Sequence, residues 1–279
     1  LKKNPSSLHL LNYQAMAYSA LKRDKEALLS YQKIIKNDPK LAGPYYNMGI
    51  ILRRNERVEE AISNYRKAIS LKPDYVQAYN NLGVLYKDNE EYENAIKMFT
   101  KAKELQPDHQ NSYYNLALIK KEQGLNEEAI ELLLKVIDLN PDHSKASLLL
   151  TTTSNELGIQ FHKEGKHKSA LKYFNLLTGL NPATAFTFYN LANTYMQLED
   201  FENAKVNFEK ALTLKPKYEP ALGNLAVAYR NLGKIEKSLR CSNESIKINS
   251  KDPNNYYNKA ITLREVERIE DAEENYRKA

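Results

Sequence analysis

The strongest constraint on the fold is a sequence pattern that returns every 34 residues. Prolines keep this interval from the start of the chain and resume it after seven additional residues, at Pro5, Pro39, Pro73, Pro107, Pro141, Pro182 and Pro216. The stretch AYNNLGVLY at 78–86 has relatives in the same register, such as PYYNMGIIL at 44–52 and TFYNLANTY at 187–195. A period of this length indicates one supersecondary unit that stacks on copies of itself.

The prolines define eight frames, of which the last is incomplete. They run 8–41, 42–75, 76–109, 110–143, 151–184, 185–218, 219–252 and 253–279. The insertion SKASLLL at 144–150 separates the fourth and fifth frames, and its seven residues are close to two helical turns. It can lengthen the next helix into a lip that presents Leu148, Leu149 and Leu150 to a partner. The alternative, which we take as the default, is local packing or a loop.

Side-chain size follows the frame. Residue 8 is Gly or Ala in all eight frames, residue 20 is Ala in all but the seventh, and residue 24 is large in all but the seventh. In frame 76–109 apolar residues recur at helical spacing, first at Tyr79, Leu82, Gly83 and Tyr86 and again at Ala95, Phe99 and Ala102. The pattern predicts a helical hairpin in which small residues at positions 8 and 20 let the helices approach closely and the ring at position 24 fills the remaining space.

These positions resemble the tetratricopeptide repeat family over essentially the whole chain. The resemblance implies an all-α fold, a right-handed superhelix (α-solenoid) of about eight helix-turn-helix repeats. First helices would line a concave groove and second helices the convex face. We therefore expect residues 1–279 to form a single solenoid domain. Because the sequence begins at Leu1 and ends inside the eighth repeat, we also expect it to be part of a longer chain.

Bulk composition excludes several classes of protein. The net charge is +6, but 41 basic and 35 acidic residues are mixed along the chain, whereas nucleic-acid binding favours a concentrated basic stripe. A single cysteine, Cys241, excludes an internal disulfide and favours an intracellular, cytoplasmic protein, with the nucleus or a cilium also compatible. No apolar run is long enough for membrane insertion. The 34-residue frame also differs from the 35-residue repeats that read RNA.

No catalytic motif is present. The five histidines lack metal-ligand spacing, and His162 and His167 are expected on different helices. Phosphate-binding loops, nucleophile elbows and dinucleotide fingerprints are absent. The sequence predicts a protein that is not an enzyme, with no cofactor, no metal and no small-molecule substrate.

Position 6 of the frame is asparagine in six repeats: Asn47, Asn81, Asn115, Asn190, Asn224 and Asn258. The family resemblance places this position on the concave groove, where side-chain amides can bind the backbone of an extended peptide. The row is similar to the asparagine ladder in the superhelical arm of O-GlcNAc transferases. Asparagine is also common at this position in the family, so the row can be partly typical of the repeat.

Position 12 is basic in five repeats: Arg53, Lys87, Lys121, Arg230 and Arg264. One interpretation is a positive line that attracts acidic peptides. The other is compensation of the helix dipole, for roughly 0.3–1 kcal/mol each. The absence of lysine at position 5 argues against the clamp with which some family members hold the C-terminal carboxylate of heat-shock chaperones.

Function then follows from the groove. The leading hypothesis is a protein–protein interaction scaffold that binds extended peptide segments and forms part of a larger complex. The alternative is the substrate-recognition arm of a larger, glycosyltransferase-like enzyme. In the seventh repeat Ser238, Ser242 and Ser245 occupy packing positions. We expect this hairpin either to be loose, which is the default, or to be covered by a partner.

Overall fold

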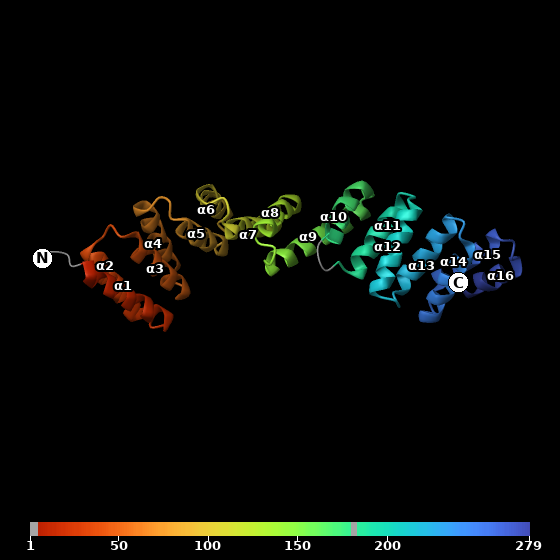
Figure 1. Ribbon diagram of the computed structural model, residues 1–279, viewed down its shortest axis with the longest axis horizontal. Coiled ribbons are helices and arrows are strands. Elements are labelled where there is room, and N and C mark those ends of the chain that lie inside the picture. Colours follow the sequence, from red (N-terminus) through yellow and green to blue (C-terminus); the bar gives the residue numbers. More distant parts are fainter. Residues whose placement is uncertain (1–4, 180–182) are drawn as a thin grey trace. The chain divides into compact units, whose positions relative to one another are not determined.

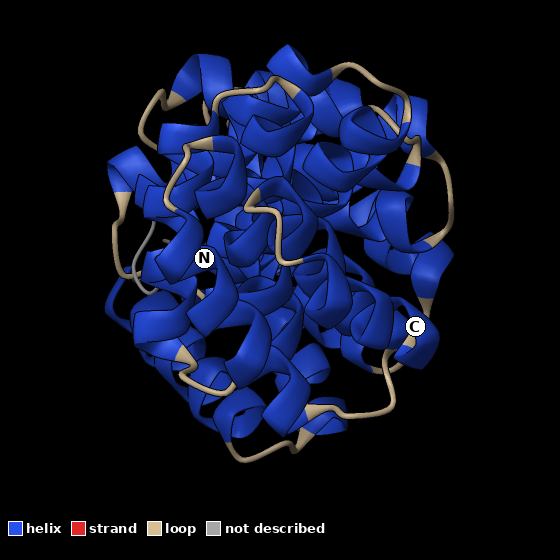
Figure 2. Ribbon diagram, turned by 90° about the vertical axis from the view of Figure 1, so that its right-hand side faces the viewer, coloured by secondary structure: helices blue, strands red, loops and turns tan. Residues whose placement is uncertain are grey.

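The structure is a computed structural model that describes residues 5–179 and 183–279, with side chains from Leu8 onward. Pro182, one of the prolines that mark the repeat, lies outside the described residues. Every regular element in the described part is an α-helix, and short loops join the helices (Figure 2). This agrees with the sequence pattern, which has helical spacing in every frame.

The described helices come in pairs, one pair for each frame (Figure 1). They are α1 (Pro5–Ala20), α2 (Asp24–Asn37), α3 (Ala42–Arg54), α4 (Val58–Leu71), α5 (Val76–Asp88), α6 (Tyr92–Leu105), α7 (Gln110–Glu122), α8 (Asn126–Leu139), α9 (Ser144–Lys163), α10 (His167–Gly179), α11 (Ala185–Gln197), α12 (Phe201–Leu214), α13 (Glu219–Asn231), α14 (Ile235–Ile248), α15 (Pro253–Glu265) and α16 (Ile269–Lys278). The predicted all-α fold of helix-turn-helix repeats is confirmed.

Packing divides the chain into two compact units, Leu1–Ser147 and Leu148–Ala279. Within each unit a first helix packs on the second helix of its own repeat, and that second helix packs on the next first helix. First helices of neighbouring repeats also contact each other directly: α3 contacts α5, and α13 contacts α15. The expectation of a single solenoid domain over residues 1–279 stays a prediction.

The hairpins close in the way that the size pattern predicts. In the second, third and fifth repeats the ring at position 24 lies under the glycine at position 8, so that a Cβ at Gly49, Gly83 or Gly158 would come within 2.7–2.8 Å of a ring carbon. Phe99, the ring under Gly83, is fully buried. The aromatic ring therefore occupies the space that a larger side chain at position 8 would need.

The turn inside each repeat has one residue with a left-handed backbone, always at position 15 of the frame. Three of these residues are glycines and five are not: Gly124, Gly165 and Gly233, and Lys22, Glu56, Glu90, Glu199 and Glu267. In the third repeat the N–H of Glu91 donates to the carbonyl of Tyr86 at 2.8 Å, which satisfies an end-of-helix acceptor. This feature was not predicted from the sequence, although three glycines at one frame position signal it.

The insertion at 144–150 lengthens a first helix. Helix α9 has 20 residues where α7 has 13, and it begins at Ser144. Leu150 is fully buried, whereas Leu148 is 67% exposed. Of the two default expectations, the loop is wrong, because seven residues add whole turns to the helix, whereas local packing agrees with the burial of Ala146 and Leu150. A role of the exposed Leu148 in contacting a partner stays a prediction.

The polar residues of the seventh repeat are buried by the chain itself. Ser238, Ser242 and Ser245 are at most 1% exposed. The Ser238 hydroxyl lies 3.2 Å from that of Thr262 on α15, and Ser245 Oγ donates to Asn255 Oδ1 at 2.7 Å. The cover comes from the eighth repeat, and hydrogen bonds between α14 and α15 take the place of apolar packing.

Candidate functional site

The six asparagines at position 6 lie on first helices, and all are half-buried. In three cases the amide crosses to position 5 of the preceding first helix. Asn81 Nδ2 donates to Tyr46 Oη at 3.1 Å, and Asn115 Nδ2 to Asn80 Oδ1 at 3.2 Å. Asn224 Nδ2 lies 3.5 Å from Tyr189 Oη. The amides therefore help to hold neighbouring repeats together, which the sequence pattern did not predict.

These bonds leave the carbonyl acceptors of the amides available, and also a donor except at Asn224, whose Nδ2 additionally lies 2.7 Å from Asn193 Oδ1. An asparagine side chain has two N–H donors and a carbonyl acceptor, and the bond to position 5 uses one donor. Asn190 Nδ2 is buried and has no hydrogen-bond partner among the described residues. Asn47 and Asn258 also lie at the half-exposed surface of their helices, α3 and α15. The row can therefore serve both the repeat interface and a bound backbone.

In five of the repeats, positions 5 and 34 lie together beside the asparagine row, at a place that we call the notch. Two rings contact each other there at a tilt in three of the repeats. The centroids are 4.8 Å apart for Tyr46 and Tyr75, and 5.0 Å apart for Tyr114 and His143. Tyr189 and Tyr218 form the third pair, also at 5.0 Å. The paired rings give the face an aromatic floor at these repeats.

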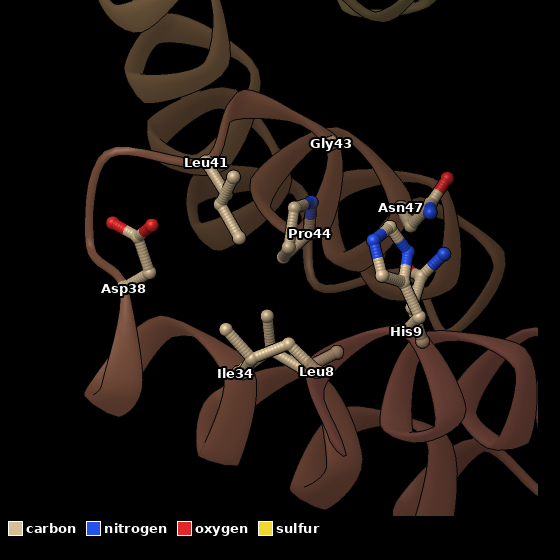
Figure 3. Close-up of a pocket in the computed structure, with 9 residues that line it drawn as sticks. Leu8, His9, Ile34, Asp38, Leu41, Gly43, Pro44 and Asn47 are labelled. Atoms are coloured by element: carbon tan, nitrogen blue, oxygen red, sulfur yellow. The ribbon is translucent and has the colours of Figure 1, made fainter. Parts of the chain in front are cut away.

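In the first repeat the same notch is open. Positions 5 and 34 are Asn12 and Leu41, and a hollow of about 350 Å³ remains. Leu8 and Ile34 lie across it from Leu41 and Pro44, while His9 and Asn47 lie together at one side (Figure 3). The hollow thus combines an apolar interior with a polar edge.

In the seventh repeat the notch is also open but polar. Position 5 is Gly223, and a hollow of about 290 Å³ is lined by Glu219, Asp252 and four asparagines, among them Asn224 and Asn258. Glu219 Oε1 accepts a hydrogen bond from Asn255 Nδ2 at 2.7 Å and lies 3.1 Å from Ser245 Oγ, whose one proton is closer to Asn255 Oδ1. The buried serine network therefore fixes the floor of this notch.

Three of the five basic residues at position 12 make ion pairs with acids at position 13. Arg53 reaches Asp88 of the next repeat at 2.9 Å, and Lys87 reaches the same carboxylate at 3.1 Å. Arg230 repeats the contact with Glu265 at 3.4 Å. Lys121 is half-buried on α7, and Arg264 is exposed on α15. Part of the predicted positive line is therefore neutralised by neighbours, which adds a third role to the two that the sequence suggested.

Metal-ligating side chains do not form a cluster among the described residues. Within the described residues no set of three or more histidines, cysteines and acids could hold a metal ion. His162 and His167 have ring centroids 5.1 Å apart, and burial followed by the charge of His167 lowers the pKa of His162. Burial raises the pKa of Cys241 to about 11, so its thiolate is scarce near neutral pH. None of the described helices is long and apolar enough to cross a membrane.

Comparison with known proteins supports the repeat assignment. Models of the tetratricopeptide repeat match residues 13–40, 30–63, 76–109, 110–143, 185–218 and 219–252, and a TPR repeat model matches 50–90. A curated relative is the probable UDP-N-acetylglucosamine–peptide N-acetylglucosaminyltransferase SEC of Arabidopsis thaliana, 27% identical over 84 residues. That match spans 30% of this chain and only 9% of the relative's length.

Two solved structures share the fold at low identity. The structure of Naa15/Naa10 bound to HypK-THB aligns with a TM-score of 0.64 at 16% identity, over 92% of this chain and 39% of that one. A tetratricopeptide repeat protein from Parabacteroides merdae aligns with a TM-score of 0.51 at 17% identity, over 96% and 99%. The family models together cover residues 13–143 and 185–252, well over half of the sequence. The chain belongs to the tetratricopeptide repeat family.

Proposed function

We propose that the chain is a non-catalytic scaffold that holds an extended segment of a partner protein against the face of its first helices. The observation that supports this most is the row of half-buried asparagines at position 6, repeated at the frame interval. Neighbouring helices pack about 8–10 Å apart, and an extended chain advances about 3.3–3.6 Å per residue. Within one unit, successive amides therefore meet about every third residue of a bound segment.

The amides and the notches would divide recognition between them. Side-chain amides can donate to a backbone carbonyl and accept from a backbone N–H, so they hold any extended sequence. The notches differ from repeat to repeat, from the apolar hollow at Leu41 to the carboxylate-lined hollow at Gly223. Specificity for the side chains of the segment would come from these differences.

A capture experiment tests the function. An Asn47/Asn81/Asn115→Ala variant and the wild type are used to capture partners from native lysate, with circular dichroism to confirm folding. The matched control is Asn37/Asn64/Asn94→Ala, which removes three amides from second helices, where Asn37 and Asn64 bond only to backbone of their own helix. We expect partners to be lost from the first variant alone. Equal capture by all three proteins would place binding elsewhere on the molecule.

A second candidate is the substrate-recognition arm of a larger enzyme. It is favoured by the similarity to the Arabidopsis glycosyltransferase over 84 residues. The test is to isolate the intact native protein with an antibody against this chain, map its peptides past Ala279, and measure transfer of labelled N-acetylglucosamine from the UDP-sugar. A scaffold would show no transfer. We place either function in the cytoplasm, which the location of a fluorescent fusion would check against nucleus and cilium.

A further inference from the structure

A third hollow lies on the first unit, between the second and third repeats. It has a volume of about 320 Å³ and is lined by Ile50, Arg53, Arg54, Tyr65 and Asn81. Tyr65 is 0% exposed, and burial raises the pKa of its hydroxyl. The Asn81 amide lies close enough to the oxygen to offset this rise slightly, but within the described structure the hydroxyl proton reaches no acceptor. A buried donor without an acceptor is costly, so this hydroxyl is available to a ligand that brings an acceptor atom.

The charged groups at the hollow leave positive charge uncompensated. Arg53 uses one nitrogen, Nη2, to bind Asp88, and Lys87 binds the same carboxylate. Two cations thus share one anion. Arg53 retains other N–H donors, because a guanidinium group carries five. Arg54 lies beside it and is paired with Asp24, to which both its Nε and its Nη2 donate, so the uncompensated charge lies at Arg53 and Lys87.

The polar groups at this hollow are therefore chiefly donors. Guanidinium groups accept no hydrogen bonds, and the one side-chain amide, that of Asn81, brings a single acceptor atom, its Oδ1, while its Nδ2 donates to Tyr46 Oη at 3.1 Å. Burial, with a smaller contribution from Tyr46, raises the pKa of Tyr65, so its hydroxyl stays protonated at neutral pH. A cationic side chain would meet the Arg53 guanidinium, and an apolar one would leave the hydroxyl without an acceptor.

We propose that this hollow binds the side-chain carboxylate of a glutamate or aspartate in the bound segment, with the Tyr65 hydroxyl and the Arg53 guanidinium as donors. The proposal rests on the proposed function, because it names the residue type that the segment presents at this repeat. Charge-assisted hydrogen bonds of this kind are among the stronger ones in proteins.

The arrangement is specific to the second repeat. Only frame 42–75 combines basic residues at positions 12 and 13 with a tyrosine at position 24. The first repeat has Tyr31 but carries Ser19 and Ala20 at those positions. In the third repeat position 24 is Phe99, which lacks the hydroxyl. If every repeat bound an anion in this way, the combination would recur in other frames. It occurs in one frame only.

The test uses the full chain and a fluorescein-labelled octapeptide that alternates alanine and glutamate, with a glutamine-for-glutamate peptide as reference. Affinities are measured by fluorescence anisotropy at two salt concentrations. The variant is Tyr65→Phe, which keeps the ring that other repeats have at position 24, and the matched control is Tyr31→Phe. Circular dichroism confirms that both variants fold.

We expect the wild type to bind the glutamate peptide more tightly than the glutamine peptide. Tyr65→Phe should lower the affinity for the glutamate peptide about tenfold and leave the affinity for the glutamine peptide unchanged. Tyr31→Phe should change neither. Equal binding of both peptides by wild type, or no effect of Tyr65→Phe, would overturn the carboxylate assignment while the peptide-binding face stands. No binding of either peptide would also overturn it, and the asparagine capture experiment decides the proposed function separately.

Discussion

Phe99 occupies the space that a side chain on Gly83 would need: its Cε1 lies 2.7 Å from the place of a Cβ on that glycine. Both residues are buried where α5 crosses α6, so the ring has little room to move. We expect Gly83→Ala to lower the free energy of unfolding by about 1–3 kcal/mol. Gly43→Ala, where nothing lies within 4 Å, is the control and should be near neutral. Urea denaturation of both variants checks this, and equal stability would contradict it.

Replacing a glycine at position 15 should lower stability for a different reason, namely the left-handed backbone conformation of that residue. Gly124 has φ of +75°, and no atom lies within 4 Å of the place that a Cβ would take, so substitution there adds strain without a clash. Gly124→Ala should lower the free energy of unfolding by about 1–2 kcal/mol. Gly124→Asn should lower it less, because asparagine tolerates this conformation. Equal loss with both residues in a urea titration would point to packing instead.

Much of the fold could be predicted because the repeat carries the same information in every frame. Gly49, Gly83 and Gly158 mark the places where the position 24 ring lies, and size alone reveals this. The turn was harder. Five of the eight left-handed residues are lysine or glutamate, which give no local signal for that backbone. Only the frame position that they share with Gly124 identifies them.

The candidate site was predicted less completely, because its contacts cross between repeats. The asparagine row is visible in the sequence, but its bond to position 5 depends on how α3 packs on α5. The pairing of Arg53 with Asp88 joins residues 35 apart, and position 12 alone gives no sign of it. The buried hydroxyl of Tyr65 could not be expected from a position where an aromatic ring is only required to fill space.

The two buried serines of α14 should respond in opposite directions to the same substitution. Ser242 is 1% exposed and its hydroxyl has no partner among the described residues, whereas the Ser245 hydroxyl donates to Asn255 Oδ1 beside Glu219. Removing an unsatisfied buried hydroxyl relieves a penalty, and removing a bonded one leaves its partners unsatisfied. We expect Ser242→Ala to be neutral or stabilising and Ser245→Ala to destabilise by about 1–3 kcal/mol. Thermal denaturation compares them, and the reverse order would contradict the assigned network.

Cys241 should be a slow nucleophile in the folded protein. Burial, and then the negative charge of Glu244, raises its pKa to about 11, so the thiolate fraction at pH 8 is far below that of an ordinary cysteine. Alkylation by iodoacetamide at pH 8 should be at least tenfold slower in the native state than in urea. Its rate should keep rising with pH to about 11. A plateau near pH 9 would show that the thiol is solvated.

Asp88 holds the position of Arg53 and also neutralises it, so its removal separates the two effects. Both side chains are substantially exposed, at 38% for Arg53 and 43% for Asp88, and such pairs stabilise proteins by at most about 1 kcal/mol. Asp88→Asn should therefore change the unfolding midpoint little. It should tighten binding of the glutamate octapeptide severalfold at low salt, because Arg53 and Lys87 lose their shared anion. The gain should fall as salt screens the charges.

The control is Glu265→Gln, which frees Arg230 in the other unit. Anisotropy titrations at two ionic strengths measure the difference: an equal gain from both variants would mean that net charge, rather than the hollow at Tyr65, attracts the acidic segment.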